Sequence, residues 1–97
     1  MIIIILKKHL DKQGLVVAVC DSDLIGKKFV EGKKQLDLTS DFYKGEEMQE
    51  KRVEELMKVA RVGNIVGKKS VALAKGLGLV ENIIIIADIP HAQYIQE

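Results

Sequence analysis

A run of four isoleucines, Ile83–Ile86, constrains the fold more than any other stretch of this 97-residue chain. Four consecutive apolar residues cannot alternate between a buried and an exposed side, and β-branched side chains favour strands. An apolar run bounded by polar residues is typical of a strand buried on both faces. We therefore predict a central strand over Ile83–Ala87, ended by Pro90, which has no N–H to donate to the sheet.

Two hairpins are predicted before this strand. Ile2–Leu6 and Leu15–Cys20 are apolar β runs separated by turn-forming residues that include Asp11 and Gly14. Further along, Lys27–Glu31 and Gln35–Thr39 are expected to pair across Gly32, with lysine pairs that protect an exposed sheet edge.

Two helices are predicted in the second half. Apolar residues at helical spacing indicate a helix from Glu46 to Val62, with Gly63 ending it at a positive φ. Asn64–Gly67 is predicted to link this helix to a second one that ends near Lys75, and residues 91–97 to form a tail. The expected fold is one α+β domain over residues 1–97, with a mixed, mostly antiparallel sheet of four to six strands flanked by two helices.

Composition limits the functional classes. The apolar runs are too short to span a membrane, and lysines follow the first apolar run, whereas a signal peptide has them before it. The one cysteine, Cys20, fits a reducing compartment, so we expect a cytoplasmic protein. With one cysteine and two histidines (His9 and His91) the chain has too few good ligands for structural zinc, and we expect neither metal nor cofactor.

Basic residues concentrate in one segment. The chain has a net charge of only +1, yet residues 56–80 contain five lysines and arginines and no acid. Such a segment is a candidate contact for an anion.

Residues 63–70 contain an approximate phosphate-binding loop. The spacing of Gly63, Gly67 and Lys68 is one residue short, and an extra lysine precedes Ser70. The motif is also predicted to follow a helix, whereas a phosphate loop follows a strand. We therefore expect no nucleotide hydrolysis.

Residues 61–79 resemble the second half of a helix-hairpin-helix module, although Ile65 replaces the module's first glycine. The first N–H groups of a helix have no internal partner and attract phosphate. The leading hypothesis is therefore a non-catalytic binding protein that contacts RNA, in a ribonucleoprotein setting, or another polyanion. Its predicted contacts are Arg61, Gly67, Lys68, Lys69, Ser70 and Lys75; an ordinary helical hairpin with a solvated basic rim is the alternative.

Two other functions remain open. A small enzyme or small-molecule binder would use Cys20 as nucleophile and His91 as base, with Asp21 and Asn64 nearby, although lone cysteines are usually buried and inert. A protein–protein adaptor, including a homodimer, would use an exposed strand edge or Phe42-Tyr43. The same two rings could stack on a base.

Short motifs across the chain carry a wider resemblance. They are Cys20-Asp21-x-x-Leu24-x-Gly26-Lys27, Glu31-Gly32, Phe42-Tyr43-x-Gly45, Asn64-x-Val66-Gly67 and Pro90-His91-Ala92-Gln93. From about Ile4 to Gln93 the chain resembles a family of small archaeal proteins of unknown function, domain of unknown function four-two-four. The resemblance implies a cytosolic α+β protein from an archaeon, with no assigned activity. It marks Cys20, Asp21, Asn64, Gly67, Pro90 and His91 as family positions, which turn, cap and packing requirements explain equally well.

Overall fold

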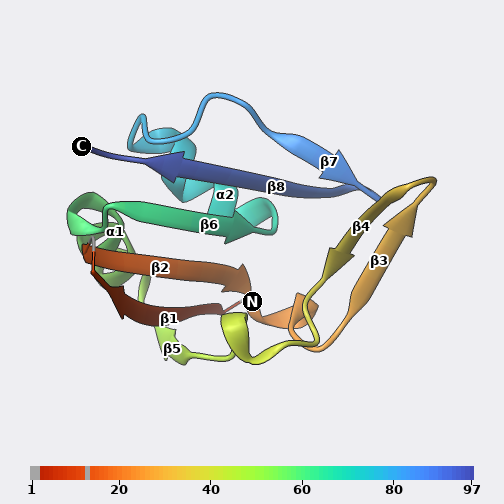
Figure 1. Ribbon diagram of the computed structural model, residues 1–97, viewed down its shortest axis with the longest axis horizontal. Coiled ribbons are helices and arrows are strands. Elements are labelled where there is room, and N and C mark those ends of the chain that lie inside the picture. Colours follow the sequence, from red (N-terminus) through yellow and green to blue (C-terminus); the bar gives the residue numbers. More distant parts are fainter. Residues whose placement is uncertain (1–2, 13) are drawn as a thin grey trace.

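In the part of the chain that the structure describes, six strands form one mixed sheet, and two α-helices pack against the same face of it (Figure 1). The computed structural model describes residues 3–12 and 14–97. Along the chain the elements are β1 (Ile4–Asp11), β2 (Gly14–Asp21), the 3₁₀ turn η1 (Ser22–Leu24), β3 (Lys28–Glu31), β4 (Lys34–Asp37), the 3₁₀ turn η2 (Asp41–Tyr43), β5 (Glu46–Met48), α1 (Glu50–Val59), β6 (Val62–Val66), α2 (Lys68–Gly76), β7 (Ile84–Ile86) and β8 (Ile89–Ile95). The predicted α+β class is confirmed.

The strands are arranged in the order β5-β1-β2-β6-β8-β7, and β2 pairs with β6 in parallel while the other neighbours are antiparallel. Strands β3 and β4 form a separate hairpin that lies across one end of the large sheet (Figure 1). None of the helices in the described part of the chain is long and apolar enough to span a membrane.

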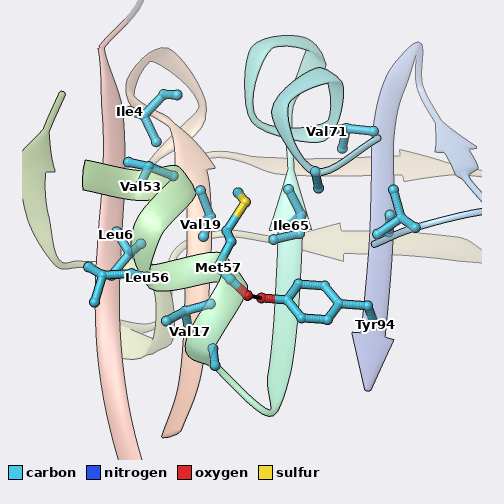
Figure 2. Packing of buried hydrophobic residues seen from close by; sticks show 14 residues of the cluster. Ile4, Leu6, Val17, Val19, Val53, Leu56, Met57, Ile65, Val71 and Tyr94 are labelled. Carbon is cyan, nitrogen blue, oxygen red and sulfur yellow. Dashed lines mark hydrogen bonds between the residues drawn. The ribbon is translucent and has the colours of Figure 1, made fainter. Parts of the chain in front are cut away.

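Alternation along β2 divides the apolar core between the two sides of the sheet. Val17 and Val19 face the helices, whereas Ala18 and Cys20 face the other side. On the helix side, α1 packs over β1 and β2, and the Tyr94 hydroxyl of β8 donates a 2.8 Å hydrogen bond to the Met57 carbonyl (Figure 2). The other side holds a second cluster, made by Ala18, Cys20, Leu24, Leu36, Leu38, Tyr43, Val66 and Ile86. Each large apolar side chain buried in this way contributes about 1.5–3 kcal/mol.

The two predicted hairpins are confirmed. β1 and β2 pair from Ile4↔Asp21 to Asp11↔Gly14, and Gly14 has a φ of 125° that favours glycine at the turn. β3 and β4 pair across a turn that contains Gly32. Ile2, which was assigned to the first strand, lies outside the described residues.

The first predicted helix is too long at both ends. Glu46–Met48 forms β5, which pairs with β1, and α1 covers only Glu50–Val59. The helix stops at Val59, with Ala60 as its C-cap, because the chain then turns toward the sheet: the Arg61 N–H donates to the Leu15 carbonyl at 2.8 Å, and β6 begins at the next residue. The second predicted helix is confirmed as α2.

The predicted link between the helices is wrong, because it is the inner strand β6. Gly63 lies within this strand and is not a positive-φ residue at a helix end. Its lack of a side chain has another cause: an added Cβ would lie 2.0 Å from the ring of Tyr94. A strand between the helices also means that residues 61–79 do not form a helix-hairpin-helix module.

The isoleucine run is not central. β7 is the edge strand, and Ile84 and Ile85 are 53% and 56% exposed. The inner place beside β6 belongs to β8, the segment predicted to be a tail, because Ala92 and Tyr94 complete the helix-side core. Pro90 therefore lies within a strand and does not end one.

Candidate functional site

The start of α2 is occupied by a carboxylate of the protein itself. Asp21, at the end of β2, is only 2% exposed. It accepts hydrogen bonds from the backbone N–H groups of Lys69 (3.1 Å) and Ser70 (2.9 Å) and from the Ser70 hydroxyl (2.6 Å). A negative group placed here satisfies free N–H groups of the helix and interacts favourably with its dipole. Asp21 therefore takes the position predicted for a phosphate.

Gly67 makes this arrangement possible. Its φ is 107°, and an added Cβ would lie 2.3 Å from the Asp21 carboxyl carbon. Its N–H also donates to the Pro90 carbonyl at 2.9 Å. Asp21, Gly67 and Pro90 thus meet where β2, β6 and β8 approach α2, and each has a structural role there.

The residues predicted to bind an anion do not form one cluster. Gly67 and the buried Ser70 are engaged as described, and the Lys69 ammonium lies 3.1 Å from Glu50. Lys68 is exposed beside a pocket of about 230 Å³ that Asp21, Asp23, Leu24 and Ile89 also line. Arg61 precedes β6 whereas Lys68 follows it, so about 20 Å of extended chain separates them.

Lys75 lies in the last turn of α2, about 10 Å along the helix from Lys68. A cation at this end interacts favourably with the helix dipole, which gives Lys75 a structural role as well.

The Gly-Lys-Lys-Ser sequence does follow a strand, contrary to the prediction that a helix precedes it. A phosphate loop is nevertheless missing, because only Gly67 separates β6 from α2. A phosphate loop needs several backbone N–H groups in an open turn, and here residues 63–66 are paired within the sheet.

Cys20 and His91 lie on the same face of the sheet, but Val66 stands between them. The register pairs Cys20 with Val66 and Val66 with His91, so their backbones are about 10 Å apart. Burial, together with the nearby carboxylates of Asp21 and Asp23, raises the pKa of the Cys20 thiol to about 12. Burial also lowers the pKa of His91. A thiol with this pKa is a poor nucleophile at neutral pH.

Asn64 is on the same face, one pair further along β6, between Ala18 and Gln93. Asp21 points to the opposite face, toward α2, so the predicted ligand site of Cys20, Asp21, Asn64 and His91 is divided by the sheet. Within residues 3–12 and 14–97 no group of three or more acidic, histidine or cysteine side chains is positioned to hold a metal ion.

Two surface features were not assigned as sites from the sequence. One is the β3–β4 hairpin, whose lysines were interpreted only as protection of a sheet edge. The other is a stack between His9 and Phe42, with ring centroids 4.5 Å apart and planes 12° apart. The sequence suggests that Phe42 could stack on a partner, but it does not identify His9 as that partner. The two residues are 33 positions apart, and local sequence patterns do not show which distant segments lie side by side.

Comparisons with known proteins agree on the fold and name no activity. Over 98% of its length the chain is similar to a crystal structure of an uncharacterized conserved protein from Methanopyrus kandleri, with a TM-score of 0.77, 23% identity and 95% of that chain covered. No curated protein matches the chain. The family model described as "Protein of unknown function (DUF424)" matches residues 9–96, and the chain therefore belongs to this family.

Proposed function

We propose that this protein is a non-catalytic binding protein that contacts RNA, or a polyanion of the same chemistry, through exposed lysines at one end of the sheet. The observation that carries the proposal is the β3–β4 hairpin, which stands outside the large sheet at the end where α2 begins (Figure 1). Residues 27–37 contain four lysines against two acids, and all four lysines are exposed.

The hairpin is anchored rather than free. Leu36 is buried in the second cluster, Phe29 packs against that cluster, and the Ala87 N–H donates to the Glu31 carboxylate at 3.2 Å. Leu24 belongs to the same cluster and Ile89 packs against it, and both residues line the pocket beside Lys68. The hairpin lysines and Lys68 therefore share one end of the molecule.

These lysines are available to an external anion. Among the residues that the structure describes, Lys27, Lys33, Lys34 and Lys68 form no ion pair. Since Asp21 occupies the amides of α2, phosphates would contact ammonium groups and not the helix terminus. Such contacts carry little sequence selectivity and weaken as salt rises.

The thiol geometry supports binding over catalysis. A buried Cys20 with a raised pKa and no adjacent base lacks the two features that activate a nucleophile. The buried free thiol is also consistent with the reducing cytoplasm that we propose as its location, in an archaeal cell as the family resemblance implies.

The proposal is tested by fluorescence anisotropy with a labelled, mixed-sequence single-stranded RNA at low and moderate salt. The double variant Lys33→Glu/Lys68→Glu is expected to weaken binding by roughly tenfold or more. The matched control Lys51→Glu/Arg52→Glu changes the net charge equally on the exposed start of α1 and is expected to change binding by less than about threefold. Absence of binding at low salt, or equal losses in both variants, would overturn the proposal.

A second candidate is a protein–protein adaptor, favoured by the edge strand β7. Its outer side is unpaired within the described sheet, and Ile84 and Ile85 are more than half exposed. Exposed apolar edge strands pair readily with another chain. Sedimentation at increasing concentration tests self-association: a wild type that dimerises and an Ile85→Lys variant that stays monomeric would support it, whereas a monomeric wild type would exclude a homodimer.

A further inference from the structure

The face of the large sheet opposite the helices is only partly covered. The second cluster and the β3–β4 hairpin lie over one end of it, and the other end is open (Figure 1). The pairing registers place two rows of side chains beside and beyond the second cluster. One row is Lys7, Ala18, Asn64 and Gln93, in which Ala18 is fully buried in the second cluster and Gln93 is exposed, and the next is His9, Val16, Val62 and Ile95.

A fixed pair of rings borders this open face. The His9 ring stacks on Phe42, and His9 Nε2 lies 2.9 Å from the Phe42 carbonyl oxygen. Phe42 also contacts Tyr43 edge to face, with ring centroids 5.1 Å apart, and Tyr43 is buried in the second cluster. Phe42 remains 37% exposed, so the ring is held in place while part of it stays accessible. A preorganised ring of this kind is a platform on which a nucleic-acid base can stack.

Two amides lie on the same face with free hydrogen-bonding capacity. Asn64 and Gln93 are directly opposite one another on β6 and β8. In the described part of the chain neither side-chain amide has a hydrogen-bond partner. An amide both donates and accepts, which matches the edges of unpaired bases.

The charge around the rings suits an anionic chain. Lys7 lies on the same face of β1 as His9, and Lys44 lies two residues beyond Phe42, next to Asp41. The Lys7 ammonium donates to the neutral backbone carbonyl of Asp41 at 2.8 Å, so this bond leaves its charge uncancelled. Lys44 pairs with Asp41 at 3.4 Å, but that carboxylate is 86% exposed and the pair is screened by water.

We propose that this open face is a binding site for single-stranded RNA, with a base stacked on the His9–Phe42 pair, base edges bonded to Asn64 and Gln93, and the backbone beside Lys7. The inference rests on the proposed function and adds to it a site separate from the lysine end. Single strands are required, because the bases of a duplex are already stacked and paired.

The test compares a single-stranded RNA with a duplex of the same sequence, against wild-type protein and two variants. Phe42→Leu is expected to weaken single-strand binding roughly tenfold, because one stacking partner is lost. The salt dependence should not change, since no phosphate contact is removed. Gln93→Ala, at an exposed position where folding is little affected, is expected to weaken binding by roughly threefold. The control Val59→Ala removes an exposed apolar side chain from α1 and should bind like the wild type.

The outcomes separate this inference from the function on which it rests. If Lys33→Glu/Lys68→Glu weakens binding while Phe42→Leu and Gln93→Ala do not, RNA binding stands and the open-face site is refuted. Equal affinity for duplex and single strand also refutes it. If no RNA binds at low salt, both proposals fail.

Discussion

The Asp21 carboxylate accepts hydrogen bonds from both the backbone N–H and the hydroxyl of Ser70, at 2.9 and 2.6 Å, and so joins the end of β2 to the start of α2. The same carboxylate fits the space that Gly67 leaves without a side chain. The start of α2 resembles a phosphate site by sequence, but the carboxylate of Asp21 already occupies it. Gly67 and Ser70 therefore stabilise the fold and are not among the proposed RNA contacts.

Replacing Asp21 with Asn is predicted to destabilise the protein by about 1–3 kcal/mol, because a neutral amide has one acceptor oxygen and no charge for the three donors. Urea unfolding monitored by circular dichroism measures this loss. The exposed neighbour provides the control: Asp23→Asn should change the free energy of unfolding by less than about 0.5 kcal/mol. Equal effects of the two substitutions would contradict the role of Asp21 as a buried cap.

The turn between β7 and β8 holds two residues in the left-handed region, Ala87 at a φ of 50° and Asp88 at 67°. Side chains with a Cβ are disfavoured there, and glycine is not. Ala87→Gly is therefore predicted to raise the free energy of unfolding by roughly 0.5–1 kcal/mol. Gly32→Ala is the reverse substitution, at a φ of 60° and with open space around the added Cβ. It should lower the free energy of unfolding by about 1 kcal/mol. A loss of stability in Ala87→Gly would show that the turn is not strained.

The Cys20 thiol is predicted to be unreactive in the folded protein, because it is buried and its pKa is raised to about 12. A thiol reagent such as 5,5′-dithiobis(2-nitrobenzoic acid) at pH 8 should react only as the protein unfolds, and at the normal rate in urea. Rapid modification of the native protein would instead restore the hypothesis of a reactive cysteine.

His91 gives the stability a defined pH dependence. Burial lowers its pKa below 6.5 in the folded state, so the unfolded chain binds the proton more readily. The protein therefore loses stability as the pH falls from 6.5 toward the lower pKa that His91 has in the folded state. The stabilising contribution of neutral His91 is fully present only above pH 6.5. His91→Gln should reduce this loss of stability in urea titrations between pH 7 and 5. An unchanged pH profile would mean that His91 is protonated equally in both states.

Local patterns were sufficient where an element depends on its own residues. The β1–β2 and β3–β4 hairpins follow from apolar runs and turn chemistry, and α2 from its flanking glycines. The α+β class follows from the combination of these elements.

Local patterns failed where distant contacts decide. A glycine such as Gly63 is typical of a helix end. Here a glycine is needed because the ring of Tyr94, 31 residues further along the chain, fills the space that a side chain would take. The isoleucines of β7 have the composition of a central strand, yet β8 occupies the inner place because its side chains complete the core. The candidate sites depend in the same way on registers, such as His9 beside Phe42 and Asn64 beside Gln93, that no single segment encodes.

RNA binding at defined surfaces is tested by nuclear magnetic resonance of the ¹⁵N-labelled protein titrated with single-stranded RNA. We predict amide shift changes in the β3–β4 hairpin and around Lys68, together with changes along the open face of β1, β6 and β8. The exposed side of α1, around Lys51, should remain unchanged. A spectrum without changes at low salt, or changes confined to α1, would show that RNA does not bind at these surfaces.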